Sequence, residues 1–246
     1  MKNVAKLKEI IDNSNNIVLF TGAGISTASN IPDFRSADGI YSKLYKDIIS
    51  PEQAVSHTFF LESTKEFYEF YFEKMVYLNA KPNKAHKFFA ELEQKGKLKT
   101  TITQNIDDLH QMASSKNVIE LHGSIKRNYC MKCKKFYTIE EIYNKIPPIC
   151  SCGGTIKPDV VLYEEGLEEK NIIDAITYIS SCDTLIVVGT SLMVYPAAGF
   201  LRYFKGDNLV LINKTKTSYD DIANLVINDD IIKVIEEYEK LSLLNE

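Results

Sequence analysis

Five short apolar segments, each followed by small or polar residues, constrain the fold of this chain more than any other feature. They have the composition of buried strands and lie at residues 16–20, 100–103, 185–188, 210–212 and 225–227. Amphipathic helical stretches lie between several of them, which indicates a parallel sheet covered by helices on both faces. In such a sheet ligands bind at the carboxyl ends of the strands, so the pattern predicts a nucleotide cleft at that edge.

The first strand runs into a glycine-rich turn, Thr21-Gly22-Ala23-Gly24-Ile25-Ser26-Thr27. Such a turn can bring backbone N–H groups up to a phosphate, although Thr27 stands where a full dinucleotide fingerprint has its third glycine. The nearby run Pro32-Asp33-Phe34-Arg35 adds a guanidinium suited to phosphate and a ring able to screen a reactive carbon from water. For the turn taken alone, an ordinary tight turn is the alternative.

Polar side chains follow the second strand directly, in the run Gln104-Asn105-Ile106-Asp107. Amide and carboxylate groups next to a buried strand are costly to bury unless they bond a partner, so they suit a site that holds a sugar. The alternative is a solvent-facing helix N-terminus, capped by Asn105 or Asp107.

His122 follows a strand-like run at residues 118–121 and precedes Gly123. Its imidazole titrates near neutral pH and can act as a general base, with a structural histidine as the alternative. The other three histidines, His57, His86 and His110, are expected in packing or structural roles on helices.

Four of the five cysteines cluster as Cys130-x-x-Cys133 and, further on, Cys150-x-Cys152. Two such pairs predict a zinc ribbon, and four thiolates make the metal structural because no coordination position stays open. Redox chemistry at the first pair is the alternative, but it leaves the second pair unexplained. The second pair is one residue shorter than usual, and Gly153 and Gly154 are expected to relax the turn that joins it to the ion.

Composition and patterning exclude several classes of function. A net charge of −4 over 246 residues, with no block of like charge, gives no nucleic-acid footprint. Residues 184–201 are uncharged, but Gly189 and Pro196 interrupt them, which favours strand, loop and helix over a membrane span. The first residues show helical periodicity and no signal peptide, so we expect a cytoplasmic protein without a disulfide framework. Nothing in the motifs indicates an oligomeric state.

At these motifs the chain resembles the sirtuins of bacterial type, a family of NAD-dependent protein-lysine deacylases, over most of its length. The resemblance implies an α/β fold with two domains. A Rossmann-like parallel sheet domain would comprise residues 1–35, 81–123 and 161–246. A smaller zinc-binding and helical domain would comprise residues 36–80 and 124–160, the two segments that break the alternation of strands and helices. NAD and an acyl-lysine peptide would lie in the cleft between the two domains.

The resemblance also implies roles for individual residues. The catalytic residues would be His122, Asn105 and Asp107. The zinc ligands would be Cys130, Cys133, Cys150 and Cys152. The NAD contacts would be Ala23, Thr27, Phe34, Arg35, Gln104, Ile106, Asp107, His122, Gly189, Thr190, Ser191, Asn213, Asp230 and Ile231. The substrate contacts would be Val160, Leu162, Met193, Val194 and Tyr195.

The reaction that the resemblance implies removes an acetyl or other uncharged acyl group from protein lysine, with release of nicotinamide and O-acyl-ADP-ribose. In it the amide oxygen attacks the ribose carbon, and His122 then helps a ribose hydroxyl to react. An NAD-dependent oxidoreductase and a non-catalytic NAD or zinc interaction module are the alternatives. Sirtuins that prefer acidic acyl chains resemble one another in a Tyr-x-x-Arg pair. This chain has Tyr68-Glu69-Phe70-Tyr71 there, which predicts poor use of succinyl-lysine.

Overall fold

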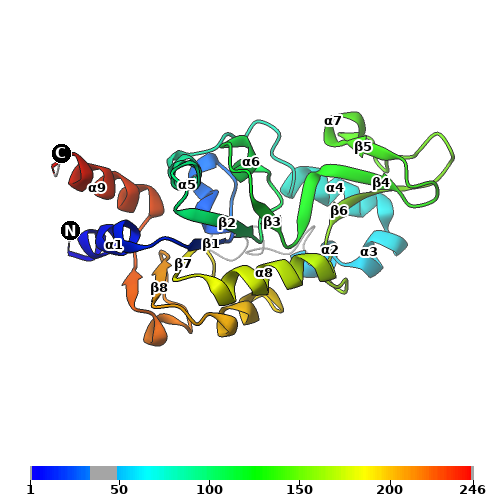
Figure 1. The fold of residues 1–246 in the computed structure, drawn as a ribbon. Helices are drawn as coiled ribbons and strands as arrows, with labels where there is room; N and C mark the ends of the chain where they lie inside the picture. The colour runs from blue at the N-terminus through cyan, green and yellow to red at the C-terminus, as the bar shows by residue number, and fades with distance from the viewer. Residues whose placement is uncertain (1, 34–48, 245–246) are drawn as a thin grey trace.

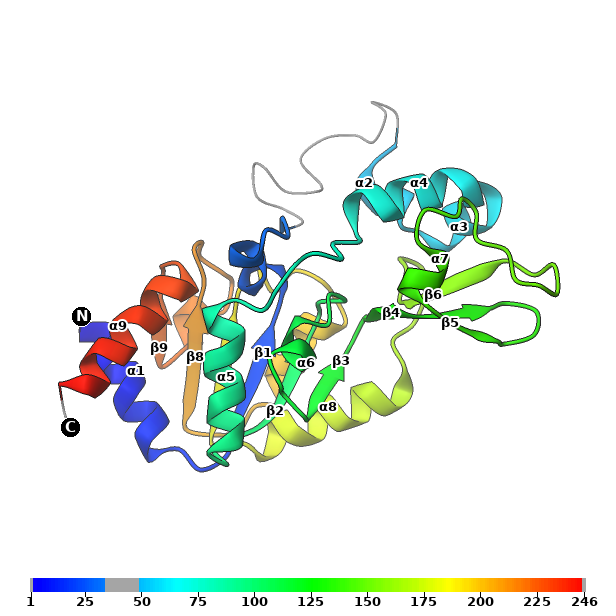
Figure 2. The same ribbon diagram turned by 90° about the horizontal axis from the view of Figure 1, so that it is seen from above.

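The computed structural model describes residues 2–33 and 49–244, which form a six-stranded sheet and a smaller three-stranded sheet (Figure 1). Phe34 and Arg35, two of the expected NAD contacts, lie outside these residues. The small sheet lies at one end of the molecule and both termini lie at the other (Figure 2). Within the described ranges, no helix has both the length and the apolar character needed to span a bilayer.

All paired strands of the large sheet run parallel, in the order β3-β2-β1-β7-β8-β9. Their bounds are Ile17–Thr21 for β1, Leu98–Thr103 for β2, Val118–Glu120 for β3, Thr184–Val188 for β7, Asn208–Ile212 for β8 and Leu225–Ile227 for β9. The chain builds the sheet on one side of β1 and then on the other, so the strand order reverses beside β1. Ligands of open α/β sheets bind at such a reversal. The five strands expected from the sequence are confirmed, with small shifts at their ends.

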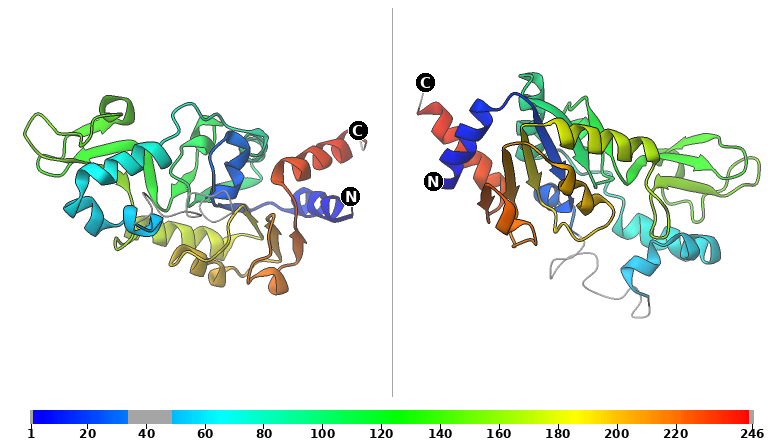
Figure 3. Two further views of the ribbon diagram at one scale, coloured as in Figure 1. Left: turned by 180° about the vertical axis from the view of Figure 1, so that it is seen from behind. Right: turned by 60° about the horizontal axis from the view of Figure 1, so that its bottom comes forward.

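Helices cover both faces of the large sheet (Figure 3). Ile17 and Leu19 of β1 belong to an apolar cluster with α1, α5 and α9, whereas Val18 and Phe20 belong to a second cluster with α8 and η4. This alternation follows from the two-residue repeat of a strand. The bounds are Lys2–Asn13 for α1, Lys84–Gln94 for α5, Glu169–Ser181 for α8, Ala197–Tyr203 for the 3₁₀-helix η4 and Ile231–Leu243 for α9.

The start and the end of α5 follow from local chemistry. The side-chain oxygen of Asn83 accepts hydrogen bonds from the N–H groups of Ala85 (2.9 Å) and His86 (3.4 Å), as expected for an N-cap. After the last turn, Gly96 adopts a φ of 74°, a left-handed conformation that favours glycine and commonly follows a helix. Local residues therefore define both ends of α5.

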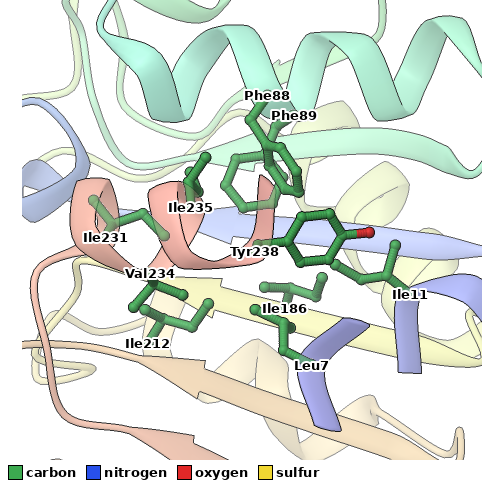
Figure 4. A pocket seen from close by; sticks show the side chains of 10 residues that line it. All are labelled: Leu7, Ile11, Phe88, Phe89, Ile186, Ile212, Ile231, Val234, Ile235 and Tyr238. Atoms are coloured by element: carbon green, nitrogen blue, oxygen red, sulfur yellow. The ribbon is translucent and has the colours of Figure 1, made fainter. Parts of the chain in front are cut away.

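A small cavity lies where α1, α5 and α9 meet the sheet (Figure 4). Phe88 and Phe89 of α5 and Ile235 and Tyr238 of α9 are among the residues that line it. Its volume is about 10 Å³, and apart from the Tyr238 hydroxyl its lining is apolar. A space of this size holds at most about one water molecule, and an apolar lining gives that water few partners. The cavity is a packing gap within the core.

The small domain combines an antiparallel sheet, in the order β5-β4-β6, with short helices. The bounds are Gly123–Cys130 for β4, Phe136–Thr138 for β5, Ile156–Val160 for β6, Pro51–Ala54 for α2, His57–Glu62 for α3, Thr64–Lys74 for α4 and Ile139–Ile142 for α7. Phe67, Tyr68 and Tyr71 of α4 pack in one cluster with Ile125 and Ile156 of the sheet. The two segments that interrupt the alternation in the sequence thus share one core. The exact domain boundaries stay a prediction.

Candidate active site

A cleft of about 590 Å³ opens at the carboxyl ends of β1, β2, β7 and β8. The large sheet lines it with residues that directly follow these strands, among them Gly22, Gln104 and Gly189. The small domain lines it with residues such as Tyr71 and Leu162. The volume lies in the range of small-molecule and cofactor sites. The predicted cleft is thus present at the predicted edge of the sheet.

Hydrogen bonds join the ends of three strands at the floor of this cleft. Gln104 Nε2 donates to Thr190 Oγ1 (3.0 Å), and the Thr190 N–H donates to Asn213 Oδ1 (2.9 Å). The buried Nδ2 of Asn213 has no hydrogen-bond partner among the described residues. An unpaired buried donor is costly, so this amide is suited to a ligand acceptor.

Ser26 connects the turn after β1 to the polar run after β2. Its hydroxyl donates to Asp107 Oδ2 (2.6 Å) and accepts from Asn105 Nδ2 (3.1 Å), which also donates to the Gly22 carbonyl (3.1 Å). The two amide hydrogens of Asn105 are therefore used within the protein, and its oxygen is the group left to face a ligand. Burial raises the pKa of Asp107, and the bonds from Ser26 and from the Leu109 N–H oppose that rise.

The glycine-rich turn differs from a phosphate cradle in one respect. It forms two short 3₁₀ turns, η1 (Ala23–Ile25) and η2 (Thr27–Ser29), and the N–H of Gly24 donates to the Gly189 carbonyl (2.8 Å). The N–H groups of residues 22, 25 and 26 also donate to protein carbonyls. The N–H groups of Gly22 and Gly24 hold the turn against the end of β7, those of residues 25 and 26 bond within the turn, and none of the four is available to a phosphate. Gly189 has a φ of 64°, and a Cβ there would lie 2.4 Å from the Ile25 nitrogen, so glycine is required.

His122 lines the cleft at the point where the chain passes from the large sheet to the small one. Its Nδ1 lies 2.9 Å from the Gln104 carbonyl oxygen, which can only accept, so Nδ1 carries the proton and Nε2 is the basic atom. Burial lowers the pKa of His122, and the bond to Gln104 partly opposes that shift. The ring is therefore held neutral at physiological pH in the tautomer of a proton acceptor.

Two further histidines, His110 and His86, form a fully buried pair. Their ring centroids lie 4.9 Å apart, and His110 Nε2 lies 3.1 Å from the Thr21 hydroxyl. Burial lowers the pKa of His86 to about 4 and that of His110 to about 3, with the neighbouring His86 adding to the shift of His110. Both rings are 1% exposed or less, which supports the expected structural role.

Apolar side chains form part of the cleft wall, at the residues where the resemblance implies the acyl-lysine. Ile106, Val160 and Leu162 line the cleft, and so does Tyr71 of α4. The ring of Tyr71 stacks on Phe67 with centroids 5.7 Å apart. Its buried hydroxyl has no hydrogen-bond partner in the part of the chain that the structure describes.

Few cations reach the cleft. Among its described lining residues, the lysines are Lys74 and Lys214, and no arginine is present. Lys74 pairs with Glu73 (2.7 Å) and Lys214 pairs with Asp230 (2.8 Å). The lysines therefore already have carboxylate partners, and the wall suits a neutral chain.

The structure brings most of the expected site residues to this one cleft. Those that line it are Ala23, Thr27, Gln104, Asn105, Ile106, Asp107, His122, Val160, Leu162, Gly189, Thr190, Ser191, Val194, Tyr195, Asn213 and Ile231. Met193 and Asp230 are not among its lining residues. Met193 is 67% exposed. Asp230 caps α9 by accepting from the Ile232 N–H (2.8 Å), while its neighbour Asp229 lines the cleft.

Sequence reasoning missed one central residue of the site, Ser26. The only signal for it was its place in the glycine-rich turn, because its partners Asp107 and Asn105 lie about eighty residues away. Its contacts depend on the parallel pairing of β1 with β2, which brings the two loops together.

The four clustered cysteines converge at one point of the small domain. Their sulfur atoms all lie within 4.8 Å of one another, with Cys130–Cys152 at 3.5 Å and Cys133–Cys150 at 3.6 Å. Tetrahedral zinc with bonds of about 2.3 Å requires sulfur separations of roughly 3.8 Å, so the cluster fits structural zinc. Cys182 lies apart and is buried in the core.

The short Cys150-Ser151-Cys152 pair fits because of the two glycines after it. Gly153 adopts a φ of 80°, and its N–H donates to the Cys150 carbonyl (2.8 Å). A Cβ on Gly154 would lie 2.7 Å from Cys130 Sγ. The Tyr137 hydroxyl donates to Cys150 Sγ (3.0 Å). The N–H of Cys152 and this hydroxyl lower the pKa of Cys150, which favours the thiolate that binds metal.

Known proteins are similar to this chain over nearly its whole length. The Sir2 family model matches residues 22–196. An NAD-dependent protein deacetylase of Clostridium acetobutylicum is 55% identical, over 96% of this chain and 98% of that protein. A solved Sir2 complex with deacetylated p53 peptide and 3'-O-acetyl ADP ribose matches with a TM-score of 0.87 and 39% identity, over 97% of each chain. Sir2Tm bound to a propionylated peptide matches with a TM-score of 0.87 and 38% identity, over 98% of this chain and 99% of that one. The chain belongs to the Sir2 family.

Proposed function

We propose that this protein removes acetyl and other uncharged acyl groups from protein lysine, with one NAD consumed in each turnover. The products are free lysine, nicotinamide and O-acyl-ADP-ribose. The observation that carries the proposal is His122, a neutral imidazole in the tautomer of a base that lines the cleft. The same cleft is lined by the amide side chains of Gln104 and Asn105 and by an apolar wall. The relatives and neighbours named above, an NAD-dependent deacetylase and complexes with acyl-peptides, support it.

The floor of the cleft fits NAD. Its polar groups are the unpartnered Asn213 amide, the oxygens of Gln104 and Asn105, and the hydroxyls that follow β7. We assign Thr190, Ser191, Asn213 and Ile231 to the adenosine side, and Gln104, Asn105 and Asp107 to the ribose and nicotinamide side. The turn at Ala23 and Thr27 completes this surface, and Phe34 and Arg35 stay predicted contacts. When bound, NAD supplies a ribose carbon whose bond to nicotinamide can be broken.

The protein contributes positioning, a proton acceptor and exclusion of water. His122 Nε2 takes the proton from a ribose hydroxyl, while its Nδ1 stays bonded to the Gln104 carbonyl. That bond fixes the ring before substrate arrives, so little reorganisation is needed when the proton moves. Asn105 and Asp107, fixed through Ser26, hold the polar end of the pocket.

The acyl-lysine side would be built from Val160, Leu162 and Ile106, and Val194 and Tyr195 line the same cleft. Tyr195 is 72% exposed, as a segment that awaits a partner would be. We propose that residues 193–195 pair with the backbone of the peptide by strand addition. The four-cysteine cluster would hold zinc as a structural ion, with all four positions closed to substrate.

Turnover of NAD with an acetyl-lysine peptide tests the proposal. Release of free nicotinamide that depends on the acetyl group is the expected result. An increase in the absorbance of the reduced cofactor would instead identify an oxidoreductase. Binding of NAD with no turnover of either kind would identify a binding module, and each of these two outcomes contradicts the proposal.

A further inference from the structure

The segment that follows β6 forms one wall of the cleft and is anchored to the start of α3. Residues 160–165 all line the cleft. The N–H of His57 donates to the Tyr163 carbonyl (3.0 Å), and the N–H of Tyr163 donates to the Val55 carbonyl (3.0 Å). Ser56 and Tyr163 thereby form an isolated parallel bridge. These two backbone hydrogen bonds thus attach the wall to the helical part of the small domain.

Glu164 adds a second attachment through its side chain. Its Oε2 accepts from both the backbone N–H (2.9 Å) and the hydroxyl (2.7 Å) of Thr58. These two donors hold the pKa of Glu164 below its ordinary value. Both residues are exposed, so the bonds form at the rim of the cleft and not in the core.

The backbone at Glu164 is in an unfavourable conformation. Its φ is 75°, in the left-handed region that residues with a side chain rarely adopt. A non-glycine residue stays there only when its surroundings hold it, and here the carboxylate bonds to Thr58 do so. The side chain of Glu164 therefore supports a backbone shape that its own Cβ disfavours.

Glu165 holds the same wall from the inner side. Its Oε2 accepts from the Leu162 N–H (2.9 Å) and pairs with Lys157 (3.1 Å), while its Oε1 lies 2.7 Å from His57 Nδ1. Since these contacts are independent of Glu164, loss of the Thr58 bonds leaves the fold of the segment in place. Loss of the Thr58 bonds removes only the outer restraint on the position of the segment.

We propose that Glu164 and Thr58 form a clasp that positions the cleft wall at residues 160–165 for the acyl-lysine peptide. The inference rests on the proposed function, because it assigns Glu164 as a positioning residue for the peptide side of that site. The clasp joins the segment after β6 to the start of α3, and none of its bonds involves the turns that follow β1, β7 and β8, so we expect its effect on peptide binding and not on NAD.

The variant Glu164→Gly separates this role from a purely structural one. Glycine accepts the positive φ without strain, so the thermal midpoint is expected to stay the same or rise. Loss of the two bonds to a charged group is expected to raise the KM for an acetyl-lysine peptide about fivefold, with kcat and the KM for NAD within about twofold of wild type. Stability and peptide affinity thus move in different directions.

A double-mutant cycle and a charge control complete the experiment. Thr58→Val removes one of the two donors and is expected to raise the peptide KM less than Glu164→Gly does. Added to Glu164→Gly it should have almost no further effect, because the acceptor is already gone. Glu164→Gln should raise the peptide KM, whereas Glu169→Gln, which removes the same charge from an exposed position on α8, should not.

An unchanged peptide KM in Glu164→Gly, additive effects of the two substitutions, or an equal rise with Glu169→Gln would overturn the clasp. These outcomes leave the proposed function intact, since the wild-type protein still releases nicotinamide. A wild-type protein that releases no nicotinamide overturns the proposed function and, with it, the inference.

Discussion

The nucleotide edge of the large sheet and the four-cysteine end of the small domain are ordered in different ways. At the nucleotide edge, side chains after β1, β2, β7 and β8 bond one another directly, as in the Gln104–Thr190–Asn213 series. At the other end, the residues around Cys130 and Cys150 sit on a three-stranded sheet with a smaller apolar core. The first region is ordered by the sheet beneath it, whereas the second contains a four-cysteine cluster that fits structural zinc.

The difference follows from how much apolar surface each region can bury. Strand β1 is covered on both faces by separate apolar clusters, so its carboxyl end is fixed before any ligand binds. A small module with a limited core commonly needs a metal or disulfides to be stable. The residues proposed as catalytic therefore follow strands of the large sheet, whereas part of the proposed substrate wall belongs to the module with the four-cysteine cluster.

Removal of the metal is the strongest way to break this comparison. Structural zinc contributes on the order of 10 kcal/mol to the folding of small metal domains. Chelation or Cys150→Ser is expected to abolish zinc binding and amide protection in β4 and β5, while β1 and β7 keep theirs. Metal analysis and hydrogen exchange measure both effects. Cys182→Ser, a buried cysteine outside the cluster, should retain the metal, and full zinc content in Cys150→Ser would contradict the assignment.

Substitution of His122 tests the nucleotide edge alone. His122→Ala should lower turnover by roughly 10² or more, the usual contribution of a general base, with NAD affinity within a few fold of wild type. Because burial lowers the pKa of His122, activity of the wild type should fall with decreasing pH only below about 6.5. Steady-state rates of the two proteins across pH measure the loss of turnover and the pH dependence of the wild type. Deacylation near the wild-type rate in the alanine variant would show that another group is the base.

The preference of the enzyme for one acyl group over another tests the cleft wall, where the large sheet and the small domain meet. Tyr71 lines the cleft at the position where Arg is expected in enzymes for acidic chains, and Lys74 and Lys214 already have carboxylate partners. Burial of an unpaired carboxylate is costly, so succinyl-lysine should have a kcat/KM at least about tenfold below that of acetyl-lysine on the same peptide. Propionyl-lysine serves as the neutral control. Equal or better use of succinyl-lysine would refute this reading of the wall.

The buried pair His86 and His110 should make the nucleotide edge sensitive to acid. Both pKa values are lowered by burial, so the unfolded chain binds more protons than the folded one below pH 6.5, and the free energy of unfolding falls as pH decreases. For His86, with a pKa of about 4, the loss between pH 7 and pH 5 is roughly 2 kcal/mol.

Urea unfolding of wild type and His86→Gln at pH 7 and pH 5 measures this effect. The variant should show a smaller difference between the two pH values, and both proteins carry the same zinc site, so acid release of metal cancels in the comparison. An identical pH dependence in the two proteins would exclude His86 as its source.

Much of the site could be read from local sequence because its residues directly follow strands. The runs at Gly22, Gln104 and Gly189 were each found as polar or small residues after an apolar segment, and all three line one cleft. The long helix α8 was not expected, although it covers one face of the sheet. The resemblance predicts Asp230 as an NAD contact, which stays a prediction, and the structure adds that its carboxylate caps α9 and pairs with Lys214. Its role depends on which way the side chain turns, and no sequence pattern specifies that.

The sequence by itself determined the strands, the polar residues at their ends and the pairs of cysteines, because each of these is a property of a few consecutive residues. Only the tertiary structure decided how the donors are used. It placed Ser26 between Asn105 and Asp107, and it bonded the N–H groups of Gly22 and Gly24 to the end of β7. It also set the tautomer of His122 through Gln104 and joined Glu164 to Thr58. Each of these contacts joins residues far apart in the chain, and a hydrogen bond depends on distance and direction that only the packed strands and loops define.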